Sequence, residues 1–399
     1  MINSYQQSFS KIKEKNNGVA GFSLKPFKIN QIKEAQSEYR SVFCNTKNIY
    51  LEFLDGSGFD IYNYDNLSAP IKTSSFSDNN SSLEENHFYK NNLMFRTYDS
   101  PSTIPLDIFD VNTTTPKLLA HFEVPYELGF KTSGIFVENN KIYLLGCDDK
   151  PDIIDKRNVL VIINWTTSTQ LEELGRLYLD LPIFSGIFVK NDHIFAVEKY
   201  SDNENFKGFK IINATNPYHP LLLAEWEENA LYSGAIYVTL NRAYFSFGAE
   251  IKIINITSLS DIHLISTIVE NESIWGLVKE NRRVYGIQSN KIILFEIDSE
   301  GLLIRKGEWI TNEGNGMFIH GCVLNNILFL TRRSEYSDRS LFILNVTDSK
   351  NIVQIYPISP PPEKSTTRNI SLGSWIHQLS LILIMLLLIY TICLFEQKK

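Results

Sequence analysis

Short apolar runs separated by polar turns recur along most of the chain. The clearest two copies are SGIFVENNKIYLL from Ser133 and SGIFVKNDHIFAV from Ser185. In each copy an apolar run leads into a turn that contains Asn, and a second apolar run follows. Because Asn tolerates the positive φ of tight turns, this pattern predicts a β-hairpin. Weaker copies of the hairpin start at Ser41, His87, Ser233, Ile274 and Met317.

Each hairpin is followed by a second recurring unit. A mostly apolar strand ends at a polar residue, and a turn rich in Thr, Ser, Asn and Pro leads into another strand. These polar anchors, spaced 47 residues apart on average, are Asn63, Asp110, Asn164, Asn213, Asn255, Glu296 and Asn345. An Asn or Asp at a strand end can accept hydrogen bonds from the amides of the following turn. We therefore assign the anchors a structural role that needs no ligand.

The two units together predict four strands per repeat and seven repeats over residues 39–357. A four-stranded unit of this length is typical of a β-propeller blade, and seven blades lie within the usual range. We therefore predict an all-β, seven-bladed propeller; an open β-solenoid or a pair of sandwiches is the alternative. The last repeat has its own fourth strand, IVQIYP, while residues 21–29 can add an edge strand, so the closure of the ring stays open.

One copy of the second unit carries a resemblance to a known family. Residues 209–220 read FKIINATNPYHP, with Pro217 and Pro220 placed four and seven residues after Asn213. This pattern resembles the LVIVD-repeat β-propellers, although other copies are degenerate and the one at Glu296 lacks the prolines. The resemblance implies a propeller fold and a binding or surface role. It implies no reaction, because a fold alone does not determine function.

The two ends of the chain differ from the repeats. Residues 1–38 form an N-terminal extension without the apolar core of a signal peptide. Residues 358–374 are Pro-rich and predict an extended stalk. Residues 375–395 contain no charged side chain and are long enough for a transmembrane helix, with a buried C-terminal helix as the alternative. With residues 396–399 as a short charged tail, we expect a single-pass C-terminal anchor, with the propeller in the cytosol or, alternatively, outside the cell.

Composition narrows the classes of partner. The formal net charge is −7, so the chain lacks the basic footprint of a nucleic-acid-binding protein. Four cysteines in 399 residues do not support a disulfide scaffold. Cys44 and Cys322 nevertheless occupy what reads as the same position, that of Val137, in the first and last repeats. They are either a clasp across the closed ring or, as we prefer, two small buried side chains.

The polar loops offer the best candidates for a binding site. The candidate residues are Asp148, Asp149, Asp152 and Asp155 in the third repeat, Asp202 and Glu204 in the fourth, and Arg332 and Arg333 in the seventh. All of them follow the second strand of a repeat, so a propeller would place them on one face. Their carboxylates suit a basic partner or Ca²⁺, or simply form a solvated acidic surface.

The histidines do not suggest a metal centre. No HExxH or paired spacing occurs, and His320 alone interrupts the apolar inner-strand segments, as a core histidine would. We therefore assign no catalytic residue and no cofactor, and we leave a metal site open. The sequence predicts a non-enzymatic scaffold for a protein partner. The alternatives are a lactonase-like hydrolase with a metal in the central channel, and a structural cell-surface component.

Overall fold

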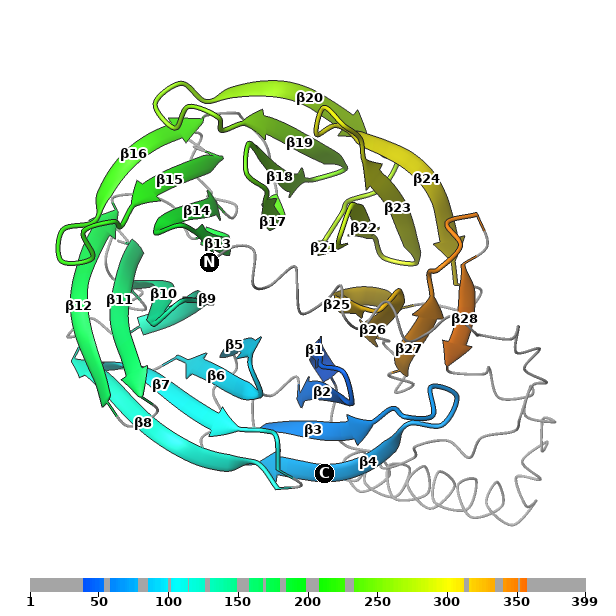
Figure 1. Ribbon diagram of the computed structural model, residues 1–399, viewed down its shortest axis with the longest axis horizontal. Helices are drawn as coiled ribbons and strands as arrows, with labels where there is room; N and C mark the ends of the chain where they lie inside the picture. Colours follow the sequence, from blue (N-terminus) through cyan, green and yellow to red (C-terminus); the bar gives the residue numbers. More distant parts are fainter. Residues whose placement is uncertain are drawn as a thin grey trace, which may run out of the picture. The chain divides into compact units, whose positions relative to one another are not determined.

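The computed structural model describes a ring of seven antiparallel sheets, each with four strands (Figure 1). It describes residues 39–53, 58–77, 85–99, 102–113, 115–125, 130–148, 158–167, 170–179, 184–198, 208–226, 233–311, 316–333, 340–350 and 352–356. In every sheet the strands pair in chain order, from the innermost strand to the perimeter. The predicted seven-bladed propeller is therefore confirmed, and we number the blades 1 to 7 along the chain.

The innermost strands surround the central channel, and the second strands form hairpins with them. The innermost strands are β1 (Tyr39–Cys44), β5 (Glu85–Lys90), β9 (Phe130–Glu138), β13 (Phe184–Lys190), β17 (Ser233–Val238), β21 (Gly276–Glu280) and β25 (Met317–Leu324). The second strands are β2 (Asn48–Phe53), β6 (Leu93–Tyr98), β10 (Lys141–Asp148), β14 (His193–Glu198), β18 (Arg242–Phe247), β22 (Arg283–Ile287) and β26 (Ile327–Arg333).

The third and fourth strands complete each blade towards the perimeter. The third strands are β3 (Gly58–Asn63), β7 (Thr103–Asp110), β11 (Asn158–Thr167), β15 (Phe209–Asn213), β19 (Glu250–Asn255), β23 (Lys291–Ile297) and β27 (Ser340–Asn345). The outer strands are β4 (Ile71–Ser77), β8 (Lys117–Pro125), β12 (Gln170–Leu179), β16 (Leu221–Trp226), β20 (His263–Val269), β24 (Leu303–Ile310) and β28 (Val353–Tyr356).

The inner hairpins turn where the Asn-rich segments predict. Asn91 and Asn92 in blade 2, and Asn325 and Asn326 in blade 7, adopt φ between 52° and 62°. Such left-handed residues match a two-residue turn to the twist of the strands it joins. This explains why Asn recurs at these positions of the repeat.

The polar anchors sit at or near the ends of the third strands. At five of them the side-chain oxygen accepts a hydrogen bond from the amide two residues ahead, as in Asn213 with Thr215 at 2.9 Å. The same bond occurs at Asn63, Asp110, Asn255 and Asn345. These contacts stabilise the turn into the outer strand, which is the structural role predicted for the anchors.

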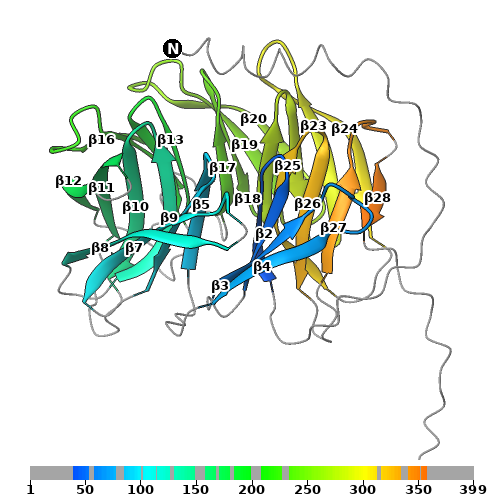
Figure 2. The same ribbon diagram turned by 60° about the horizontal axis from the view of Figure 1, so that its bottom comes forward.

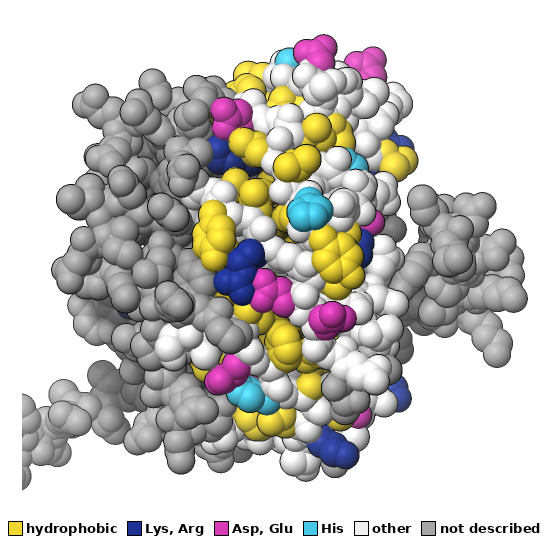
Figure 3. Space-filling model, turned by 90° about the vertical axis from the view of Figure 1, so that its left-hand side faces the viewer, with side chains coloured by type: hydrophobic (Ala, Val, Ile, Leu, Met, Phe, Trp, Pro, Cys, Tyr) yellow, Lys and Arg dark blue, Asp and Glu magenta, His cyan; other side chains and the backbone are white. Residues whose placement is uncertain are grey.

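Apolar clusters at the seven contacts between neighbouring blades form the core. The third strands supply its most deeply buried side chains, such as Phe209 and Ile211 in blade 4. The outer strands alternate towards solvent, and Tyr218 and Leu221 are among the exposed apolar residues of the perimeter. Figure 3 shows one part of this perimeter, where apolar and charged side chains are interspersed. Each blade is thus stabilised mainly by its two neighbours.

The ring closes by side-chain packing between blades 7 and 1. Val42 and Leu51 of blade 1 share one cluster with Phe329 and Ile343 of blade 7. The outer strand β28 pairs with β27 of its own blade, so within the described residues no strand is exchanged between the ends. Residues 21–29, which could have added an edge strand, lie outside the described residues.

A β-bulge recurs at one place in all seven outer hairpins. The outer-strand residue beside this bulge is small in blades 1 to 6, namely Ser74, Ala120, Gly175, Ala224, Ser266 and Gly307. In blades 3 and 6 the turn of the next blade approaches it so closely that a Cβ on Gly175 or Gly307 would lie within 2.4 Å of a backbone oxygen. The small residue therefore sets the spacing between blades.

The predicted flanking segments fall outside the described part of the chain. This applies to the extension 1–38, the stalk 358–374, the span 375–395 and the tail 396–399. Among the described residues, no helix has the length and apolarity needed to cross a membrane.

Candidate binding site in the central channel

A belt of half-buried side chains runs around the channel on the innermost strands. In blades 2 to 5 it consists of Phe88, Phe136, Phe188 and Tyr237, whose successive ring centroids lie 4.8, 5.0 and 5.1 Å apart. Pairing with the second strands places Phe43 of blade 1, Val278 of blade 6 and Cys322 of blade 7 at the same level. Contacts between aromatic rings at these distances are favourable. The belt therefore joins the blades around the channel axis.

Two residues before the belt, the inner strands carry small side chains. In blades 3 to 6 these are Gly134, Gly186, Ala235 and Gly276. Gly186, Ala235 and Gly276 leave space that aromatic rings fill at the belt, so the channel widens there into a cavity of about 570 Å³. The space beside Gly134 is instead taken by the side chain of Ile187. Gly248 and Ser273 also line the cavity. Gly248 follows a second strand and Ser273 precedes an inner strand, so both lie at the end of the ring where these connections emerge (Figure 2). The cavity therefore lies towards the face for which the loop-borne site was predicted.

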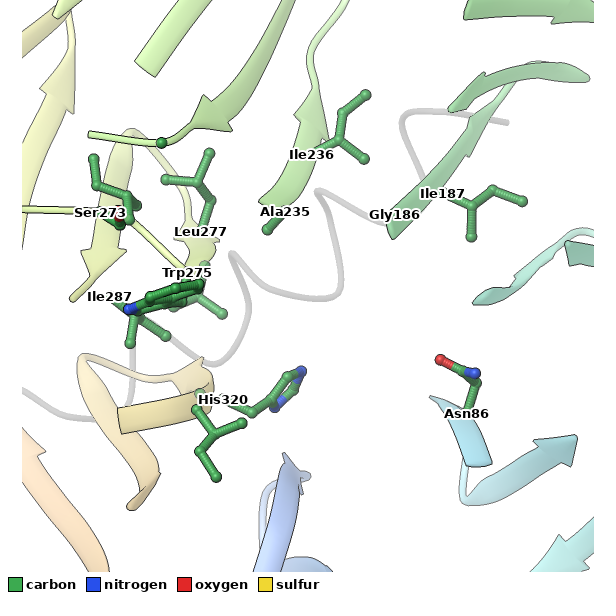
Figure 4. Close-up of a pocket in the computed structure, with 16 residues that line it drawn as sticks. Asn86, Gly186, Ile187, Ala235, Ile236, Ser273, Trp275, Leu277, Ile287 and His320 are labelled. Carbon is green, nitrogen blue, oxygen red and sulfur yellow. The ribbon is translucent and has the colours of Figure 1, made fainter. Parts of the chain in front are cut away.

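Trp275, His320 and Asn86 supply side chains with hydrogen-bonding groups to the cavity (Figure 4). The indole of Trp275 is 42 % exposed, and its Nε1 donates to Ser289 Oγ at 3.3 Å. This partly exposed ring therefore stays available to a ligand while one hydrogen bond fixes it. An exposed Trp held in this way is typical of the residues that dominate binding interfaces.

The polar side of the cavity is formed by His320 of blade 7 and Asn86 of blade 2. The imidazole Nδ1 of His320 accepts a hydrogen bond from the Val42 amide at 3.3 Å, and Asn86 donates to Thr132 Oγ1 at 2.9 Å. Sequence reasoning had assigned His320 to the core. It is half-buried and lines the cavity, and its ring also contacts Phe43 of the next blade, with the ring centroids 5.5 Å apart.

A buried polar cluster lies between blades 1 and 2, on the two inner strands of blade 1 and the innermost strand of blade 2. The Ser41 hydroxyl donates to the Glu52 carboxylate, and His87 Nδ1 lies 3.0 Å from the other carboxylate oxygen. Ser41 and His87 therefore both contact the Glu52 carboxylate. In a catalytic triad the histidine would instead contact the serine hydroxyl and act as its base. The geometry supports a structural link between the blades. Sequence reasoning missed it because its members are isolated residues of three different strands.

The loop-borne site predicted from the sequence is described only at its edges. Asp148 ends β10, while Asp149, Asp152, Asp155, Asp202 and Glu204 lie outside the described residues. Arg332 is only 4 % exposed and its guanidinium lies 5.9 Å from the Phe342 ring, which leaves it little surface to offer a partner. Arg333, the next residue, is exposed. Alternation along β26 explains the difference, because successive side chains point to opposite faces.

The described residues include no group of three His, Cys, Asp or Glu arranged to hold a metal ion. The acidic loops that could take Ca²⁺ fall in the undescribed segments.

The cysteines of blades 1 and 7 differ from the expected register. Cys44 pairs with Ile49, as Val137 pairs with Ile142, but Cys322 pairs with Phe329, as Phe136 pairs with Tyr143. They are therefore one position apart in the repeat, and the expectation of equivalence was wrong. Both are free thiols that pack against the cluster between the two blades. Burial, followed by the hydrogen bond with Cys44, raises the pKa of the Cys322 thiol.

Comparisons with known proteins concern the fold alone. No family model and no curated protein matches the sequence. Among solved structures, a functionally unknown protein from Desulfotomaculum acetoxidans aligns with a TM-score of 0.59 at 13 % identity, over 78 % of this chain and 96 % of its own. Kuenenia stuttgartiensis hydrazine synthase aligns at 0.57 and 7 % identity, over 79 % of this chain and 100 % of its own.

A computationally designed protein, Ika8, is also similar, with a TM-score of 0.52 and 11 % identity over 78 % of this chain and 97 % of its own. At such low identity these likenesses carry no information on activity or ligand. They agree with the blade topology in showing a β-propeller fold.

Proposed function

We propose that the protein is a non-enzymatic binding scaffold that receives a protein partner on the face where the channel cavity opens. The observation that supports this most directly is the cavity of about 570 Å³ beside the 42 % exposed Trp275. A concave apolar site with a few polar groups at its edge is the usual form of a binding pocket. The blades hold this site rigidly, which lowers the entropy that binding must overcome.

The chemistry of the cavity fits an apolar anchor on the partner. Ile187, Ile236 and Leu277 line it together with Trp275, and His320 adds a hydrogen-bonding edge. A large aliphatic or aromatic side chain of the partner would gain buried area against these residues. The second strands of blades 3 and 4 end on the same face, and acidic residues follow both of them in the sequence, so we expect basic residues around that anchor.

Truncation of the anchor tests this proposal. The full chain and its Trp275→Ala variant are used to capture proteins from detergent-solubilised membranes, and bound proteins are quantified by mass spectrometry. Tyr218→Ala is the matched control, because Tyr218 is 59 % exposed on a perimeter turn away from the cavity. We expect partners to be lost with Trp275→Ala and retained with Tyr218→Ala. Equal recovery by both variants would contradict the role of the cavity.

The loops are tested separately. Replacing Asp148, Asp149 and Asp152 together by Ser should weaken recovery of the same partners, because the substitution removes the negative charge that we expect to meet basic residues. Unchanged recovery removes these loops from the proposal without affecting the cavity.

The membrane attachment is also part of the proposal. We infer that residues 375–395 hold the ring at a membrane through the stalk 358–374, with the propeller on the cytosolic side. Protease added to intact cells should then leave the ring attached, and cleavage in the stalk should require permeabilisation. Release of the ring from intact cells would place it on the outer surface.

A further inference from the structure

The end of the channel opposite the cavity has a different charge pattern. There the inner strands of blades 2, 3, 4 and 6 end in a charged residue, namely Lys90, Glu138, Lys190 and Glu280. Each is the last residue before the inner hairpin turn, so the four occupy one position of the repeat. The contact that this residue makes with the next blade depends on whether the residue is acidic or basic.

Where this residue is acidic, its carboxylate binds the turn of the next blade. Glu138 accepts a hydrogen bond from the Asp192 amide of blade 4 at 3.3 Å. Glu280 accepts from the Asn325 amide and, at 2.9 Å, from the Asn326 amide of blade 7. A carboxylate thus sits over these two turns.

Over the turn of blade 5 the position holds a cation. Lys190 of blade 4 takes the place of the glutamate, and Lys279 reaches the same area from blade 6. The Lys279 ammonium donates to the Tyr237 hydroxyl at 3.1 Å and lies 4.5 Å from the centre of that ring. Among the described residues, the Lys190 ammonium group has no hydrogen bond or ion pair. Two ammonium groups therefore converge where other blades place a carboxylate.

Electrostatics agrees with this geometry. The pKa of Lys190 is lowered, chiefly by burial and then by the charge of Lys279, while Glu138 acts in the opposite direction. The structure thus holds a half-buried ammonium group beside a second one, an arrangement that an anion would stabilise.

The two lysines line a groove of about 760 Å³ together with Tyr237, Thr239 and Arg242. The other charged groups of the groove have contacts of their own. Arg242 donates to Asn255 Oδ1 and to the backbone oxygen of Glu300. Asp298 accepts from two amides of its own turn, and the Glu300 side chain is exposed. The groove therefore has room for an anion at the lysines.

We propose that this groove binds a phosphate group, held between the Lys190 and Lys279 ammonium groups and the Tyr237 hydroxyl. Three hydrogen-bond donors from three blades suit the several oxygens of a phosphate better than the two of a carboxylate, and lysine is a common phosphate ligand. The doubly charged form also balances the two ammonium groups. The group comes either from inorganic phosphate or from a monoester. The site lies on the face opposite the cavity and does not depend on the proposed scaffold function.

The test is calorimetric titration of the full chain in a nonionic detergent at constant ionic strength. Inorganic phosphate and glycerol phosphate are titrated in parallel, with chloride as the blank. We expect saturable binding that weakens at least tenfold in Lys190→Gln and in Lys279→Gln. Lys117→Gln, an exposed lysine on the perimeter strand β8, is the matched control and should bind as the unmodified chain does. If glycerol phosphate binds and inorganic phosphate does not, the natural ligand is a phosphate monoester and not the free ion.

A stability measurement keeps the test independent of folding. Without phosphate, Lys190→Gln should unfold at the same temperature as the unmodified chain or higher, because the variant removes a desolvated charge beside Lys279. With phosphate, only the unmodified chain and Lys117→Gln should gain stability. No binding at 20 mM of either ligand, or an unchanged affinity in Lys190→Gln, would overturn the proposal.

Discussion

The spacing between blades 6 and 7 gives the sharpest test of the fold. Gly307 lies beside the bulge of β24, and the turn of blade 7 passes directly over it. A Cβ built on Gly307 would lie 2.1 Å from the Ser349 carbonyl oxygen, which is backbone and cannot rotate away. The substitution Gly307→Ala therefore forces the turn to move by about an ångström, and Gly307→Val forces it further.

Two opposing effects determine how much the free energy of unfolding falls in the Gly307 variants. Overpacking of a well-packed contact costs about 1–3 kcal/mol, whereas replacing Gly within a strand returns about 0.5–1 kcal/mol of chain entropy. Ala120 and Ala224 occupy the equivalent position in blades 2 and 4, so a blade can accommodate a methyl group at a wider spacing. We therefore expect a loss of about 1–2 kcal/mol for Gly307→Ala and about 1 kcal/mol more for Gly307→Val.

Thermal unfolding followed by circular dichroism measures this effect. For a ring of roughly 300 residues the unfolding entropy is near 0.6 kcal/mol/K, so 2 kcal/mol corresponds to a decrease in Tm of about 3 °C. Ser266→Ala is the control, because it keeps a small residue at the same position of blade 5. If the Tm of Gly307→Val lies within half a degree of that of Ser266→Ala, the turn of blade 7 does not pack against Gly307 as closely as the structure indicates.

Three further predictions concern buried and titratable groups. The hydrogen bond to Asp107 raises the pKa of His121, so His121→Gln should cost stability at pH 5.5 and little at pH 8; the 45 % exposed ring limits this to below about 1 kcal/mol in urea titrations. Lys210 is fully buried 3.0 Å from Glu225, so Glu225→Gln, which removes the charge of one partner, should lower the free energy of unfolding by about 1–3 kcal/mol in the same titrations. Because burial raises the pKa of Cys322, its alkylation by iodoacetamide at pH 8, read by mass spectrometry, should be slow until urea unfolds the ring.

The fold was predictable because similar local signals recur in most of the seven repeats. Asn at the inner turns supplies the left-handed residues of a hairpin, and the anchors bind the following turn in a local contact that spans two residues. Such short-range signals can be recognised even when single copies are degenerate, because a weak copy lies between clearer copies at the expected spacing. Ring closure was not predictable, because it depends on packing between Val42 and Phe329, residues far apart in the sequence.

Single positions were harder to predict than the repeat. Cys322 was placed one residue off because an apolar run gives no internal mark of register, and β25 contains a bulge between Phe318 and His320. Arg332 was expected at the surface because it precedes a polar loop, yet its alternation within β26 turns it inwards. A charge near a strand end is thus a weak predictor of exposure when the end of the strand is uncertain.

The channel shows how one sequence motif can carry more than its local structure. In both SGIFV copies the aromatic residue contributes to the belt, and in blade 4 the glycine two positions earlier, Gly186, lines the cavity. The hairpin pattern therefore also determines part of the shape of the channel. The sequence alone does not show this shape, because only the closed ring determines which residues of the hairpin face the axis. The same reasoning applies at the opposite end, where Lys190 and Glu138 are interchangeable for the hairpin but place opposite charges over the next blade. The repeat therefore fixes the scaffold, while the departures from it at axis-facing positions are where binding chemistry can differ from blade to blade.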